Sequence, residues 1–134
     1  DTWHREVLAT LGAVRAAVPW HLSLTTHHRD LDDAEFLDAL KASGVDEAVA
    51  MVYTTREATA RATIERLLAK TARGPRIALA QSVESALPAN ESSFLKGRSA
   101  SLTIWRNLVT ALSPNQRFSG LIVQSLADYE KARP

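Results

Sequence analysis

Hydrophobic and polar positions along the chain change their period several times, and each change marks a predicted element. Between Thr2 and Val18, apolar residues recur at three- and four-residue steps among alanines. This spacing predicts an amphipathic helix, which Pro19 ends. From Trp20 to Thr26, large apolar and polar residues alternate instead, as in a strand with one buried face. The chain therefore begins with a helix followed by a strand.

The alternation of helix and strand continues to the end of the chain. The remaining predicted elements are a helix from Asp32 or Asp33 through Leu40, a strand from Val45 to Tyr53, a helix from Arg56 to Ala72, a strand from Arg76 to Val83, a helix from Ser99 to Leu112, a strand from Phe118 to Leu126 and a last helix from Ala127 to Arg133. Asp32 or Asp33 can cap the second helix, and Gly44 can end it.

The third predicted helix is rich in alanine, arginine and glutamate. We expect Thr54 and Thr55 to cap it, and Gly74-Pro75 to terminate it. Its inward face is predicted to carry Ala58, Ala62, Ile64, Leu67 and Leu68. Its arginines and glutamates then form a solvated outer face.

This order of elements predicts an α/β fold, because a helix between two strands makes a right-handed crossover and leaves the strands parallel and adjacent. Four such βα units form half of a TIM (β/α)₈ barrel. The alternative is a small open parallel sheet with helices on both faces, but such folds commonly bind ligands through a glycine-rich first turn, and the five glycines do not cluster. We expect residues 1–134 to form a single domain, the C-terminal half of a larger barrel. Its unpaired edges favour self-association in the absence of the N-terminal half.

Composition excludes several classes of function. The 16 basic and 15 acidic residues give a net charge of +1, which lacks the basic character of nucleic-acid binders. The absence of cysteine excludes disulfides, thiolate metal sites and a cysteine nucleophile. No apolar run approaches the roughly 18 residues of a membrane span.

Polar residues gather where the predicted strands end, which is where parallel α/β folds place their chemistry. The exits carry His27, His28 and Asp30 on the first strand, Tyr53 and Thr54 on the second, Gln81, Glu84, Asn90 and Glu91 on the third, and Gln124, Ser125 and Asp128 on the fourth. A glutamate that closes a buried strand, as Glu84 does, can be a general acid or base or can anchor a hydroxylated ligand. The alternative is a solvated loop carboxylate.

Other kinds of site are not expected. His27 and His28 should leave a strand on opposite faces, and no second histidine pair completes a set of metal ligands. The loop after Glu84 has no glycine pair of the kind that binds phosphate, and no Gly-x-Ser-x-Gly turn indicates an acyl-transfer triad. We therefore expect neither a metal ion nor a cofactor.

Two segments resemble the (β/α)₈ glycoside hydrolases of the chitinase-like family 18 type. Val-Asp-Glu-Ala-Val-Ala-Met-Val-Tyr at Val45 to Tyr53 resembles strand six of that family, and Phe-Ser-Gly-Leu-Ile-Val at Phe118 to Val123 resembles the approach to strand eight. Leu22 to Thr26 and Ile77 to Glu84 then correspond to strands five and seven. The resemblance covers the whole chain as the back half of a barrel.

The resemblance implies a carbohydrate ligand, because in that family the tyrosine equivalent to Tyr53 lines the sugar subsite beside the catalytic acid. The chain also departs from the family: the catalytic acidic motif belongs to strand four, which would end before Asp1. In addition, Thr54 replaces an acidic or amide residue, and Gln124 replaces Trp or His. We expect Glu84 to be the catalytic candidate, and Tyr53, Gln124, His27 and Asp128 to bind substrate. Hydrolysis would need residues upstream, and a non-catalytic domain that binds a glycan or a protein is the alternative.

Overall fold

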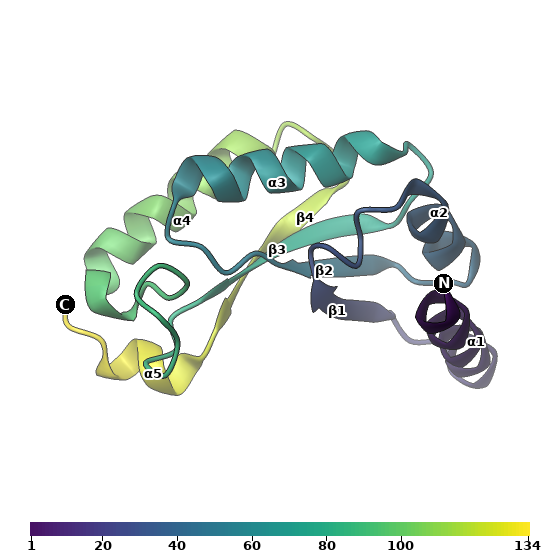
Figure 1. Ribbon diagram of the computed structural model, residues 1–134, viewed down its shortest axis with the longest axis horizontal. Helices are drawn as coiled ribbons and strands as arrows, with labels where there is room; N and C mark the ends of the chain where they lie inside the picture. Colours follow the sequence, from purple (N-terminus) through teal and green to yellow (C-terminus); the bar gives the residue numbers. More distant parts are fainter.

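A computed structural model describes all 134 residues. The helices are α1 (Thr2–Ala17), α2 (Ala34–Ala42), α3 (Glu57–Lys70), α4 (Arg98–Leu112) and α5 (Leu126–Lys131), with a short 3₁₀ helix η1 (Phe94–Lys96). The strands are β1 (Ser23–His27), β2 (Glu47–Met51), β3 (Arg76–Ser82) and β4 (Phe118–Gln124). α1 lies at one end of the molecule, and α5 with the C-terminus lies at the other (Figure 1). No helix has both the length and the apolar character needed to cross a membrane.

The four strands form one open parallel sheet in the order β1-β2-β3-β4, which confirms the predicted α/β fold. Thr25 pairs with Val49, Val49 with Ala78, and Ala78 with Gly120, so residues at the middle of each strand lie in one row. The register shifts between Ile77 and Ala78 where β3 meets β4. Each strand therefore lies beside the strand that precedes it in the chain.

All five helices supply side chains to a single core on one face of the sheet. This core joins Leu40, Ile64 and Leu108 of the helices to Ile77 and Leu79 of β3. Val49, Ala78 and Ala80 form a separate cluster on the other face, where only Met51 and Tyr53 pack against them. The predicted alternative with helices on both faces is therefore not observed, and we call the face without helices the open face.

The helices differ from the prediction at several positions. Thr54 does not cap α3: Arg56 is the N-cap residue, and its backbone N–H donates to Thr54 Oγ1 at 3.2 Å. The inward face of α3 consists of Ala60, Thr63, Ile64, Leu67 and Leu68, while Ala58 and Ala62 are exposed. Alanine-rich helices give a weak apolar period, so several rotations of the helix fit the sequence almost equally well.

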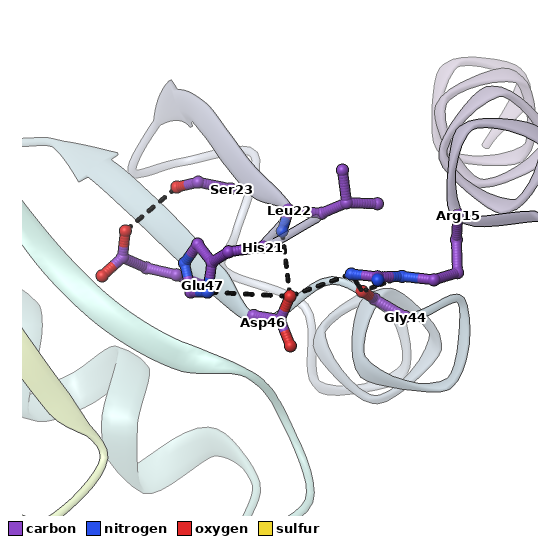
Figure 2. Close-up of polar contacts among 7 residues, drawn as sticks. All are labelled: Arg15, His21, Leu22, Ser23, Gly44, Asp46 and Glu47. Carbon is purple, nitrogen blue, oxygen red and sulfur yellow. Dashed lines mark hydrogen bonds and ion pairs between the residues drawn. The ribbon is translucent and has the colours of Figure 1, made fainter. Parts of the chain in front are cut away.

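Polar contacts at the amino ends of the strands connect α1 to the sheet (Figure 2). Asp46, just before β2, accepts hydrogen bonds from Leu22 N and Arg15 Nη2, each at 2.9 Å. The same guanidinium donates to Gly44 O at 2.8 Å. Gly44 has φ +89°, and a Cβ at this position would lie 2.6 Å from Arg15 Cγ. Since α1 buries no residue completely, this polar connection contributes to holding it in place.

Arg117 lies at the same end of the sheet, just before β4, and its side chain contacts the C-terminal end of α3. Its guanidinium donates to Leu68 O at 3.1 Å, to Pro75 O at 3.2 Å and to Thr71 O. The last carbonyls of a helix lack partners within the helix, and a cation also interacts favourably with that end of the helix dipole. Arg117 thus ties the end of α3 to the start of β4.

We predict that Asp46 stabilises the protein only above acid pH. The hydrogen bond from Leu22 N, together with the charges of Arg15 and His21, lowers the pKa of Asp46. A lowered carboxyl pKa gives stability that is present above the usual value of roughly 3.9 and is lost as the pH falls through the folded-state pKa. Asp46→Asn should therefore unfold at lower urea concentration than wild type at neutral pH, and the gap should shrink below about pH 4.

The matched control is Glu6→Gln, which neutralises an exposed carboxylate on α1. Urea unfolding curves of the three proteins at neutral and acid pH make the comparison. A gap between wild type and Asp46→Asn of the same size at both pH values would contradict the prediction.

We predict a larger effect at Arg117. Arg117→Met keeps an apolar stem but leaves three carbonyls without their donor, which should lower the free energy of unfolding by about 2 kcal/mol. Arg106→Met, on the exposed surface of α4, is the control and should change the stability little. Denaturant unfolding of both variants measures the difference, and equal effects would show that the carbonyl contacts do not stabilise the fold.

Candidate functional site

The carboxyl ends of the four strands carry a row of polar side chains along the edge of the open face, which we call the rim. His27 pairs with Met51 across β1 and β2, and Ser82 pairs with Gln124 across β3 and β4. Tyr53 lies two residues beyond Met51 and packs against the open-face cluster. The rim thus runs across the sheet from His27 on β1, through Tyr53 and Ser82, to Gln124 on β4, with Glu84 just beyond β3.

Glu84 is held by Ser82, the last residue of β3. Ser82 Oγ donates to Glu84 Oε2 at 2.9 Å, and the backbone N–H of Glu84 donates to Ser82 Oγ at 3.1 Å. Ser82 is 2% exposed, whereas Glu84 is half-buried. One carboxylate oxygen is therefore held by a buried hydroxyl while the group still reaches solvent. The sequence analysis did not identify Ser82 as a site residue, although its place two residues before Glu84 puts both on the same side of an extended chain.

Burial and the negative charge of Glu84 both affect the pKa of the Tyr53 phenol. Burial raises the pKa of the Tyr53 phenol, and the negative charge of Glu84 raises it further. Both effects disfavour the phenolate, so Tyr53 keeps its O–H at neutral pH. The ends of β2 and β3 thus carry a hydroxyl donor and a carboxylate acceptor.

The loop after Glu84 is attached at three points. Thr55 N donates to Asn90 O at 3.0 Å, Ser93 N donates to Ser82 O at 2.9 Å, and Ser85 N donates to Asp128 Oδ2 at 3.0 Å. These bonds link the loop to the ends of β2 and β3 and to α5. Asp128 therefore positions the loop, and one of its carboxylate oxygens is already occupied by Ser85.

Gln81 and His28, two other strand-exit residues, have structural contacts. The Gln81 side chain lies on the helix-covered face and is 2% exposed. Its Nε2 donates to Val52 O at 2.5 Å, so Gln81 does not lie on the rim.

The centres of the His27 and His28 rings lie 4.4 Å apart, although adjacent side chains of a strand should point to opposite faces. β1 ends at His27, and His28 is already in the following turn. Burial lowers the pKa of His28, with the charge of His27 adding to the effect.

No group of three or more His, Cys, Asp or Glu side chains in the chain is arranged to hold a metal ion.

His27 Nδ1 accepts a hydrogen bond from Arg29 N at 3.2 Å. In the neutral imidazole this places the proton on Nε2, which can then donate to a ligand. The rim can therefore supply both hydrogen-bond donors and hydrogen-bond acceptors without a metal.

A hollow of about 570 Å³ lies beside the exit of β1. It is lined by Asp1, Trp3, His4, Arg29, Asp30 and Asp33.

We predict that Glu84→Gln lowers the pKa of Tyr53, because it removes the charge that disfavours the phenolate. The pKa should stay above the usual value of roughly 10, since burial is the larger cause. The chain has two tyrosines, so a Tyr129→Phe background isolates Tyr53 in an ultraviolet titration of the phenolate.

Glu130→Gln is the control for this titration, because it neutralises an exposed glutamate of α5. It should leave the pKa of Tyr53 unchanged. An equal pKa of Tyr53 in wild type and Glu84→Gln would contradict the close approach of the two side chains.

Comparisons of the chain with protein-family models, with curated proteins and with solved structures found no match. The feature that the structure shares with the glycoside hydrolase barrels is an α/β fold with a parallel sheet, here of four strands.

Proposed function

We propose that this chain binds a carbohydrate at the rim, as part of a glycoside hydrolase-like barrel. The observation that carries the proposal is the position of Tyr53 and Glu84, which follow the carboxyl ends of the adjacent parallel strands β2 and β3. A carboxylate accepts strong hydrogen bonds from sugar hydroxyls, and a tyrosine supplies both an apolar ring and a hydroxyl. His27 and Gln124 extend the same row with a ring N–H and an amide.

Binding is better supported than hydrolysis by this chain alone. Glycoside hydrolysis usually needs two carboxyl groups about 5 to 9.5 Å apart on either side of the scissile bond. Glu84 lies directly after β3, whereas Asp128 lies on α5 and holds the loop through Ser85 N, so Glu84 is the carboxylate that continues the rim row. Catalysis would require a second carboxylate from outside these 134 residues, and Glu84 would then be the candidate catalytic residue.

The second candidate function is a non-catalytic domain that binds a protein partner. The exposed apolar side chains support it, since Trp20 is 70% exposed and Leu126 is 72% exposed. The two lie at opposite ends of the sheet, because Trp20 precedes β1 and Leu126 follows β4. A protein that binds at either place would leave Glu84 and Tyr53 unused.

We predict that Glu84→Gln weakens carbohydrate binding by about tenfold, because a hydrogen bond to a charged group is worth roughly 1.5 to 3 kcal/mol. Tyr53→Phe should also weaken binding, by a smaller factor. Isothermal titration calorimetry with chitooligosaccharides, and with xylo- and cello-oligosaccharides as alternatives, measures the affinities.

Glu6→Gln on the exposed surface of α1 is the control and should bind as wild type does. Circular dichroism should show that all variants are folded, since a half-buried rim carboxylate contributes little to the core. Equal sugar affinity of wild type and Glu84→Gln, or no binding of any of these sugars by wild type, would count against the proposal.

A further inference from the structure

Two edges and one face of the sheet have no partner within the chain. The strand order makes β1 and β4 the edge strands, so one side of each strand presents backbone N–H and C=O groups that no other strand pairs. The open face between them carries Val49, Ala78 and Ala80, and no helix covers it. At the two edges of this face, Thr25 is exposed and Ile122 is 43% exposed.

The exposed area is larger than that of a compact monomer. The chain exposes 7514 Å². A compact protein of 14.6 kDa is expected to expose roughly 6,900 Å². The excess of roughly 600 Å² is close to the area of about 800 Å² that each partner buries in a standard interface. The excess exposed area is thus of the same order as the area that one partner buries in a stable contact.

We propose that a second copy of the chain covers this surface and closes the two sheets into an eight-stranded parallel barrel. A two-fold axis parallel to the strands keeps the strand direction, so β1 of one copy pairs in parallel with β4 of the other copy. The symmetry repeats this contact on the opposite side, and no edge is left unpaired. All helices already lie on the outer face, as in a barrel with an outer ring of helices.

The position of the rim follows from the same symmetry. Because the axis runs along the strands, the carboxyl ends of all eight strands lie at one end of the barrel. From a strand spacing of about 4.8 Å and a tilt of about 36°, opposite strands of such a barrel are roughly 15 Å apart. The rims of the two copies would then face one another across one mouth. Closure of the barrel does not depend on what the rim binds.

Sedimentation of the 134-residue chain tests the proposal, with no sugar present. Wild type should form a species of twice 14.6 kDa. Ile122→Asp places a charge inside the closed barrel and should weaken association by about a hundredfold or more. Leu102→Asp introduces the same charge at a side chain that is 36% exposed on α4, outside the barrel, and should associate as wild type does.

Oxidative cross-linking gives a second readout that does not depend on the folding of Ile122→Asp. The chain has no cysteine, so a Thr25→Cys, Ile122→Cys double variant has a clean background. β2 and β3 separate the two positions within one chain, so a disulfide should form only between copies. Each single variant places its cysteines on opposite sides of the barrel and should not cross-link.

Three results would overturn the proposal. A monodisperse wild-type monomer would assign the open face to a different occupant. Open polymers in place of a species of twice the chain mass would exclude closure. Cross-linking of the single cysteine variants as efficient as that of the double variant would exclude the proposed pairing of β1 with β4.

Discussion

The right-handed connection between parallel strands is the constraint on which the rest of this structure depends. Four consecutive strands lie side by side in chain order, so each connecting helix is carried to the same face of the sheet. β3 shows the consequence in its side chains: Ile77 and Leu79 pack under the helices, whereas Ala78 and Ala80 face the other way. One core is built and one face is left without helices.

The two ends of the sheet have different roles. At the amino ends, Asp46 and Arg117 satisfy backbone groups that would otherwise lack partners, and they connect α1 and α3 to the strands. At the carboxyl ends, Glu84 and Gln124 reach solvent. A parallel sheet can separate stabilising contacts from a ligand site in this way, because the loops that follow its strands all lie at one end.

The rim is held by hydrogen bonds within the chain. Ser82 is buried and positions Glu84, while Asp128 holds the loop through Ser85. Binding groups that are fixed before the ligand arrives lose less entropy on binding. Each of the two carboxylates accepts one bond within the chain: Asp128 from Ser85 N in the loop, and Glu84 from Ser82 Oγ.

The sequence by itself determined the elements, their parallel order and the strand exits that form the rim. Asp33 caps α2 through Phe36 N at 3.0 Å, and Gly44 has the positive φ expected after the end of that helix. These features follow from local periodicity and capping, which a few neighbouring residues specify. Tyr53 and Glu84 could be placed on one rim for a related reason, because both follow the ends of adjacent parallel strands.

Only the tertiary structure decided which side chains are free to act. Asp128 and Ser85 are separated by 43 positions, so no local pattern shows that the carboxylate is occupied by the loop. The rotation of α3 that buries Ala60 in place of Ala58 and Ala62 depends on how that helix packs on the sheet and on α4. The contact between His27 and His28 depends on where β1 ends. Local sequence sets the conformation of the backbone, whereas contacts between distant segments are set by the packing of the whole chain.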